Sequence, residues 1–175
     1  EMCIRDRIKD EIMYLESIIN AIDIATTEND LNNIKDELAV TGYIKRSGKS
    51  KSKGNTHNKP MHYVSSDGFD IYVGKNNIQN DELTFKFATG GDWWFHAKQM
   101  PGSHVIVKTE GKELPDKTFE EAAALAAYYS KGRDLEKVEV DYVLKKEVKK
   151  PAGAKPGFVV YYTCLLYTSP SPRDK

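Results

Sequence analysis

Residues 90–107 have the sequence GGDWWFHAKQMPGSHVIV, and this stretch decides how the rest of the chain is arranged. It begins with a Gly-Gly-Asp turn signal and continues with four consecutive ring-bearing residues at positions 93–96. A second turn signal at 101–103 precedes the β-branched run at 105–107. Aromatic and β-branched runs that are bounded by glycine and proline are typical of strands. The stretch therefore predicts two strands joined by a tight turn.

Side chains alternate between the two faces of a strand, so the first of these strands divides into two sets. Trp93 and Phe95 share one face, and Trp94, His96 and Lys98 share the other. One set can enter a core. The other set would then present a flat ring, an imidazole and an ammonium group side by side.

Two interpretations of the Trp94 face stay open at this point. Most aromatic side chains in a small domain bury their area in a core, so the hairpin can be purely structural. Alternatively, Trp94 is a stacking platform, and His104 approaches the same neighbourhood if the two strands pair. A zinc site at His96 and His104 lacks a third ligand and any cysteine spacing, so we predict no metal site and no cofactor.

The motifs in this stretch closely resemble the signature of the NFACT-R domain. This family is the RNA-binding module of RqcH- and NEMF-type ribosome quality control factors, whose bacterial members are also named fibronectin-binding protein A homologues. The resemblance covers about residues 8–163. It is carried by DWWFH at 92–96, PGSHV at 101–105, SSDG at 65–68, VGKNNIQND at 73–81 and VKKPAGAKPGFV at 148–159.

The resemblance implies a role for the chain in translation. Members of the family bind large ribosomal subunits stalled with peptidyl-tRNA, and bacterial members recruit alanyl-tRNA to extend the nascent chain with alanine. Ribosomal RNA and tRNA are therefore the expected partners. We expect alanine tailing to belong to a longer protein whose amino-terminal domain carries much of the tRNA contact. The present chain would supply RNA binding and part of an arm.

A cluster of lysines between positions 145 and 155 is the second candidate for RNA contact. Prolines and a glycine restrain this segment, and a dense group of cations on a fixed scaffold suits phosphates. A solvated loop is the alternative. The full set of predicted RNA-binding residues is Trp94, His96, Lys98, Ser103, His104, Lys145, Lys146, Lys149, Lys150 and Lys155.

Charge is distributed unevenly along the chain. The 26 basic and 26 acidic residues cancel, so the net charge predicts no partner. Residues 1–40, however, carry ten acids against four bases, and residues 41–60 carry six bases and no acid. No apolar run has the length of a membrane span, and no signal-peptide pattern is present, so we expect a cytoplasmic protein with no membrane contact.

Both ends of the chain, residues 1–7 and 164–175, differ from the rest. They resemble translated sequencing-adapter sequence, so we expect neither end to contribute to the fold. Both cysteines, Cys3 and Cys164, lie in these ends. The remaining chain therefore has no disulfide or thiolate chemistry, which also suits the cytoplasm.

The first part of the chain predicts a helical arm. Apolar residues recur at heptad spacing between acidic and basic ones, which favours the end of an antiparallel coiled coil whose partner strand is missing. The heptad seam consists of Ile8, Ile12, Leu15, Ile19 and Ile22.

The chain after this arm predicts a short helix and a linker. Threonines at 26–27 predict the start of a shorter helix that ends at Gly42. The basic residues 45–60 predict a flexible linker, either a tether or a nonspecific RNA contact.

Together these signals predict an α+β fold. We expect a small mixed, mostly antiparallel sheet packed by one long and one short helix, and preceded by the coiled-coil arm segment. The Asp67-Gly68 pair predicts a hairpin. The expected divisions are an arm and short helix at 8–44, a linker at 45–60 and the NFACT-R-like domain at 61–163. Within that domain we expect a helix over 115–132 and strands over 138–144 and 158–162.

No catalytic constellation stands out, so we do not expect an enzyme. Asp92 and His96 could form an acid–base pair, but neither a nucleophile nor a metal accompanies them. The alternative to RNA binding is a protein-interaction module that docks through the acidic arm, or a surface adhesin that binds fibronectin. The lack of a signal-peptide pattern argues against the adhesin.

Overall fold

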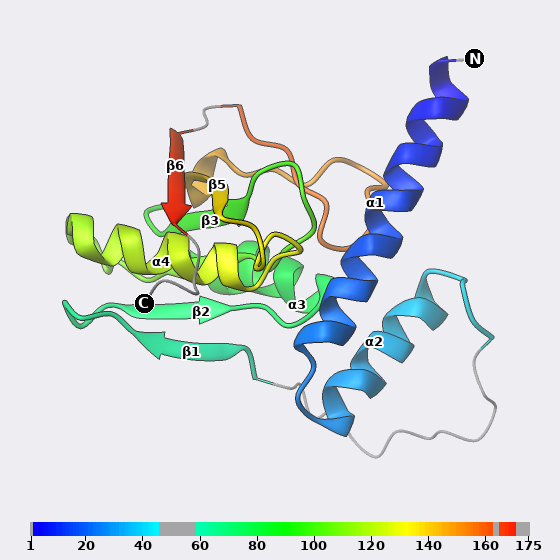
Figure 1. Cartoon of the computed structure of the whole chain (residues 1–175), viewed down its shortest axis with the longest axis horizontal. Coiled ribbons are helices and arrows are strands. Elements are labelled where there is room, and N and C mark those ends of the chain that lie inside the picture. Colours follow the sequence, from blue (N-terminus) through cyan, green and yellow to red (C-terminus); the bar gives the residue numbers. More distant parts are fainter. Residues whose placement is uncertain (1, 46–58, 163–164, 171–175) are drawn as a thin grey trace.

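The computed structural model describes residues 2–45, 59–162 and 165–170, and Figure 1 shows their arrangement. The chain begins with the helices α1 (Met2–Ile24) and α2 (Glu28–Val40). The remaining elements, in chain order, are β1 (Met61–Val64), β2 (Asp70–Val73), α3 (Asn77–Glu82), the π-helix η1 (Leu83–Phe87), β3 (Trp93–Ala97), β4 (Val105–Val107), α4 (Asp116–Tyr128), β5 (Lys137–Leu144), the 3₁₀ turn η2 (Lys145–Glu147) and β6 (Leu165–Pro170).

The six strands form one open sheet in the order β1-β2-β4-β3-β5-β6. All five pairings between them are antiparallel, which confirms the predicted α+β class. The β1–β2 hairpin turns at Gly68, whose φ of +82° favours glycine. Strands β3 and β4 pair directly, so the hairpin predicted from residues 90–107 is confirmed.

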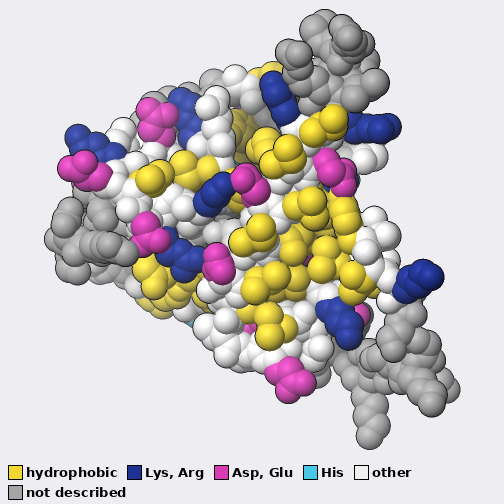
Figure 2. Space-filling view, turned by 45° about the vertical axis from the view of Figure 1, so that its right-hand side comes forward, with side chains coloured by type: hydrophobic (Ala, Val, Ile, Leu, Met, Phe, Trp, Pro, Cys, Tyr) yellow, Lys and Arg dark blue, Asp and Glu magenta, His cyan; other side chains and the backbone are white. Residues whose placement is uncertain are grey.

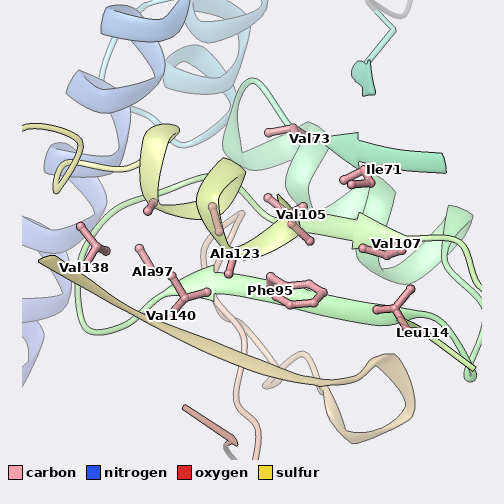
Figure 3. Close-up of a cluster of buried hydrophobic side chains, with 13 residues drawn as sticks. Ile71, Val73, Phe95, Ala97, Val105, Val107, Leu114, Ala123, Val138 and Val140 are labelled. Atoms are coloured by element: carbon pink, nitrogen blue, oxygen red, sulfur yellow. The ribbon is translucent and has the colours of Figure 1, made fainter. Parts of the chain in front are cut away.

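Helix α4 covers one face of the sheet and encloses the main core (Figure 3). Four alanines of α4 are fully buried, and their small side chains let the helix axis approach the strands closely. Phe95 lies on this face with no exposed surface, and Trp93 packs against the same cluster. The face assigned to Trp93 and Phe95 from alternation is therefore a core face. The alanines are Ala122, Ala123, Ala126 and Ala127.

A second core covers the opposite face of the sheet. Trp94 lies at its centre with 0% of its surface exposed, packed with Ile106 and Val143. The cover comes from Leu83 of η1 and from the segment after β5, which contributes Val148. The expectation that Trp94 is an exposed stacking platform is therefore wrong. Alternation placed the ring on the correct face, but the residues that cover this face are distant in sequence.

Helices α1 and α2 lie side by side and form a third cluster (Figure 1). Helix α2 begins with a capping box in which Thr27 and Asp30 exchange hydrogen bonds, as the threonine signal predicts. Tyr14, Ile18 and Ala21 are the buried residues that α1 contributes to this cluster, and Ile34 faces them from α2. The heptad seam lies on the other side of α1, where its five side chains are 38–58% exposed.

Two segments near the end of the chain differ from expectation. Residues 158–162 do not form a strand; only Val160 pairs, in an isolated bridge with Lys149, because the edge of β5 is paired with β6 instead. Strand β6 forms instead at 165–170 and pairs with β5, and Tyr167 packs against the main core. Residues 164–175 were expected to take no part in the fold, and β6 contradicts this. Residues 2–7 likewise continue α1.

Most of the basic linker, residues 46–58, lies outside the described residues, so the interpretation of that stretch stays a prediction. Among the helices that the structure describes, none combines the length and apolarity needed to cross a membrane.

Candidate nucleic-acid interface

The lysine loop, residues 145–157, is held by backbone hydrogen bonds at its start and again at Lys149. At its start, the Lys145 amide donates to the carbonyl of Asp92 at 2.8 Å, and the Lys146 amide donates to Gly90 at 3.3 Å. Further along, Lys149 and Val160 exchange hydrogen bonds of 2.8 and 2.9 Å. The loop is therefore a fixed scaffold for cations, as the sequence predicts.

Three lysines of this loop are free of carboxylate partners among the residues that the structure describes: Lys145, Lys146 and Lys149. Two of them lie beside aromatic rings. The Lys145 ammonium is 5.8 Å from the Phe85 centroid, and the Lys149 ammonium is 6.0 Å from the centroid of Tyr162, which is 81% exposed. Cations beside rings can neutralise phosphates while the rings stack bases. We call Lys145, Lys146 and Lys149 the lysine surface.

The other two lysines of the loop are held by the protein itself. Lys150 forms an ion pair with Asp81 at 2.7 Å and donates to the carbonyl of Lys155 at 2.7 Å. Lys155 pairs with Glu11 of α1 at 2.5 Å and donates to the Tyr43 hydroxyl at 2.8 Å. These two ammonium groups therefore join the loop to α3 and to the helical arm, and they are less available to phosphates than the sequence suggested.

The rings of Trp94, His96 and His104 come together as predicted. The centroids of Trp94 and His96 are 5.5 Å apart in a stacked arrangement, and His104 lies 5.2 Å from Trp94 and 5.4 Å from His96. Tyr161 closes the group from the loop side, 5.0 Å from Trp94, and its hydroxyl donates to Asp141 at 2.6 Å. Tyr161 therefore covers the Trp94 ring from the side of the loop.

His104 has a structural role in this cluster. It is buried, one ring nitrogen lies 2.8 Å from the Thr84 hydroxyl, and the other lies 3.2 Å from the carbonyl of Gly157. A neutral ring satisfies both contacts if Thr84 donates to the bare nitrogen and the ring N–H donates to Gly157. Burial and the neighbouring His96 hold the pKa of His104 well below its ordinary value, so the ring is uncharged at neutral pH.

His96 is partly exposed and borders a cavity of about 210 Å³ between α1, the β3–β4 turn and the lysine loop. Burial lowers the pKa of His96 to about 4, although backbone contacts at Gly102 and the Asp141 carboxylate act in the opposite direction. At neutral pH the ring is therefore a neutral hydrogen-bonding group. It does not supply a positive charge for phosphates.

The two remaining predicted residues are also committed to the fold. Ser103 is buried, and its amide donates to the carbonyl of Tyr129 at 2.9 Å. Lys98 follows β3 and pairs with Glu139 at 3.2 Å. Within the described ranges, no group of three His, Cys, Asp or Glu side chains could hold a metal ion.

Asp92 links the lysine surface to the rest of the sheet. Its buried carboxylate accepts from the Lys108 ammonium at 2.5 Å and from the amides of Thr89 and Thr109 at 2.7 and 3.1 Å. Burial opposes ionisation, but these donors hold the pKa of Asp92 below its ordinary value. The carboxylate serves these donors, so the acid–base pair with His96 that the sequence allowed has no support in the geometry.

Sequence reasoning missed Phe85 and Tyr162, the two rings beside the lysine surface. Phe85 belongs to η1, 60 positions before Lys145, and Tyr162 follows the loop. Phe85 lies in a π-helix, which follows neither the 3.6-residue nor the two-residue repeat, so neither period places its ring. Its ring position could be found only in three dimensions.

An antiparallel sheet with one covering helix, and with a loop whose unpaired lysines lie beside rings, is typical of a nucleic-acid-binding module. Residues 59–162 match the family described as NFACT protein RNA binding domain, and the chain belongs to this family.

Relatives of known name match most of the chain. It is 46% identical over 154 residues to the Rqc2 homolog RqcH of Streptococcus suis, and 41% identical over 155 residues to that of Bacillus subtilis. Each match covers 87% of this chain and 27% of the relative, so the chain spans about a quarter of the length of these curated relatives.

A solved structure matches the fold closely. It is described as the C-terminal of the fibronectin/fibrinogen-binding protein from Streptococcus suis, with a TM-score of 0.89 and 41% identity. The match covers 99% of this chain and 68% of the solved one.

Proposed function

We propose that this chain is the RNA-binding part of a ribosome quality control factor. In this role it binds large ribosomal subunits that carry peptidyl-tRNA, contacts ribosomal RNA and tRNA in the cytoplasm, and takes part in tRNA recruitment for alanine tailing. Its contribution is binding, with no catalytic step. Family membership and the names of the relatives support this assignment.

The lysine surface is the observation that carries the proposal. Its three ammonium groups have no carboxylate partner among the described residues, and two lie beside rings. Each ammonium placed near a phosphate releases a condensed counterion, which makes affinity depend on salt. Three contacts with a single strand predict a slope of about −2 in a plot of log affinity against log salt.

The test is RNA binding by fluorescence anisotropy over a range of salt concentrations. Changing Lys145, Lys146 and Lys149 to Glu should weaken binding to all RNA sequences alike and flatten the slope by about two units. The matched control changes three exposed lysines on other parts of the surface, Lys112, Lys117 and Lys137, so the net charge changes equally. Equal losses in both triple variants would show a net-charge effect and remove the lysine surface from the proposal.

Ribosomal binding needs its own measurement. Co-sedimentation with purified large subunits, with and without peptidyl-tRNA, separates the two expected RNA partners. The triple lysine variant should pellet less in both cases. Equal pelleting of the original chain and this variant would contradict ribosome binding through the lysine surface.

The exposed heptad seam of α1 favours a second, protein-docking role. Figure 2 shows hydrophobic side chains gathered on the face that α1 and α2 present. Ile12 and Ile19 of the seam are 52% and 58% exposed, and contiguous apolar surface of this kind often marks a protein-interaction site. The occupant we infer is an apolar helix that completes an antiparallel coiled coil. In sedimentation experiments, changing Ile12 and Ile19 to Glu should abolish any helix-mediated association while RNA affinity is retained.

A further inference from the structure

A second surface with rings lies at the β1–β2 end of the sheet. A groove of about 790 Å³ runs between this hairpin and the helical segment α3–η1. His62 and Tyr72 line it from the strands, and Phe87 lines it from the end of η1. Lys59 and Lys86 also line the groove. No residue of this groove belongs to the site predicted from the sequence.

The groove continues the row of side chains that contains Trp94. The strand register places Trp94 beside Ile106, Ile106 beside Tyr72, and Tyr72 beside His62. Because partners in register point to the same face, all four side chains lie on one face of the sheet. The inner pair is buried, whereas Tyr72 is half-buried and His62 is exposed. The residues that cover the second core do not extend to the edge of the sheet, so the outer two side chains of this row, Tyr72 and His62, are accessible to solvent.

The three rings of the groove are ordered against one another. His62 stacks on Tyr72 with centroids 4.7 Å apart and planes at 22°, and Tyr72 meets Phe87 edge-on at 4.8 Å. Asp70 holds the His62 ring through a contact of 2.6 Å. Phe87 is 44% exposed, and the Lys108 ammonium lies 5.0 Å from its centroid. The rings therefore form a prepared surface with little side-chain freedom left to lose on binding.

Charge at the groove suits a polyanion. The Lys86 side chain is 77% exposed and has a long contact of 3.4 Å with Glu82, one turn away, which competes weakly with a phosphate. Lys59 lies at the other boundary and has no ion-pair partner among the residues that the structure describes. The nearby acids are Asp70, which contacts His62, and Glu82, whose long contact with Lys86 a phosphate would replace. Ordered rings with cations around them are how proteins bind unpaired bases and their phosphates.

We propose that this groove binds one or two unpaired bases of a single RNA strand, stacked on Tyr72 and Phe87, with Lys59 and Lys86 near the adjoining phosphates. This rests on the proposed RNA-binding function and adds the form of RNA that is recognised. Rings at a sheet edge are reached by unstacked bases, whereas bases inside a duplex are not accessible to them.

The test compares three RNA probes of equal length by fluorescence anisotropy on the full chain: a single strand of adenines, the same strand with abasic positions, and a duplex. Tyr72→Ala should weaken binding of the adenine strand by about 5- to 150-fold, the usual range for loss of one stacked base. Tyr72→Phe should retain the affinity because the ring is kept. The abasic strand and the duplex should bind the original chain and Tyr72→Ala alike.

Tyr128→Ala is the matched control, because Tyr128 is a 47% exposed tyrosine on α4, which covers the other face of the sheet. It should leave the affinity for the adenine strand unchanged. If Tyr72→Ala proves unstable by circular dichroism, Phe87→Ala replaces it, since Phe87 is exposed at the end of η1. Unchanged affinity for the adenine strand in a folded variant would overturn the groove while leaving the lysine surface intact.

Two further outcomes are decisive. Equal weakening of the duplex and of the adenine strand in Tyr72→Ala would mean recognition without base stacking, which overturns the inference alone. If the original chain binds none of the three probes at low salt, the proposed function fails and the groove proposal fails with it. The probes therefore distinguish failure of the inference from failure of the function on which it rests.

Discussion

The Lys155 ammonium lies 2.5 Å from the Glu11 carboxylate, which ties the lysine loop to helix α1 across 144 positions of sequence. The same ammonium lies 4.7 Å from the centroid of Tyr14. A lysine that looked like a phosphate contact in the sequence is thus one of the residues that attach the arm. The lysines of the loop therefore divide into two that hold the loop to other elements and three that have no carboxylate partner among the described residues.

The first prediction tests this division. Lys155→Gln should leave the salt slope of RNA binding nearly unchanged, whereas Lys149→Gln should flatten it by about 0.7 for the loss of one phosphate contact. The stability cost of Lys155→Gln should stay near 1 kcal/mol or below, because the ion pair is partly exposed. Anisotropy and urea unfolding measure the two effects. A larger loss of slope for Lys155→Gln would return this residue to the interface.

The second prediction concerns Trp94. Trp94→Ala should lower the free energy of unfolding by about 3–5 kcal/mol, since it removes a fully buried large ring from the second core. Tyr162→Ala is the control: its ring is 81% exposed, so stability should change by no more than about 0.5 kcal/mol. Urea unfolding measures both variants. A stable Trp94→Ala protein with weakened RNA affinity would instead restore the platform interpretation.

The third prediction is a pH dependence that His96 causes. Its pKa is about 4 in the folded protein and about 6.5 in the unfolded chain, so the unfolded state binds more protons between these values. The contribution of a neutral His96 to the free energy of unfolding should therefore be complete above about pH 6.5 and should decrease as the pH falls towards 4. His96→Gln should remove a part of this decrease on the order of 2 kcal/mol.

The measurement is the free energy of unfolding at several pH values for the original protein and for His96→Gln. The carboxylates that also titrate in this range contribute equally to both proteins, so their effect cancels in the difference. The buried His104 contributes in the same direction and remains in both proteins. A direct check is the NMR titration of the His96 ring. A midpoint near 6.5 would contradict the assignment.

The fourth prediction concerns β6. Removing residues 164–175 should destabilise the protein, because β6 pairs with six residues of β5 and Tyr167 packs on the main core. Tyr167→Ala alone should cost about 1–2 kcal/mol for the lost apolar contact. Thermal unfolding measures both changes. A truncated protein that melts at the original temperature would show that β6 contributes nothing and that the expectation from sequence was correct.

The sequence predicted helices and strands well where the turn-forming residues and the spacing of apolar residues indicated the same element. The β1–β2 hairpin, the capping box of α2, helix α4 and strand β5 all have strong local signals, and each forms close to its expected range. The two faces of β3 also follow from alternation alone. These features depend on neighbours in sequence, which is why one sequence sufficed.

The candidate site was predicted less well because exposure is decided at long range. Nothing near Trp94 in sequence shows that Leu83 and Val148 will cover it. The ion pairs of Lys150 and Lys155 reach Asp81 and Glu11, 69 and 144 positions away. For β6, the atypical composition of the end of the chain outweighed its strand-like run. Charge and ring type were visible in the sequence, but accessibility was not.

The hydrogen bonds of Asp92 have a mechanical consequence. Its carboxylate holds Lys108, which lies against the ring of Phe87 in the groove, and its carbonyl holds the first residue of the lysine surface. One buried residue therefore bonds to a lysine of each surface, and a displacement of either surface would strain these bonds. An RNA strand that reaches both would meet them at a constant separation, so the length of strand between its stacked bases and its bound phosphates is set by the protein.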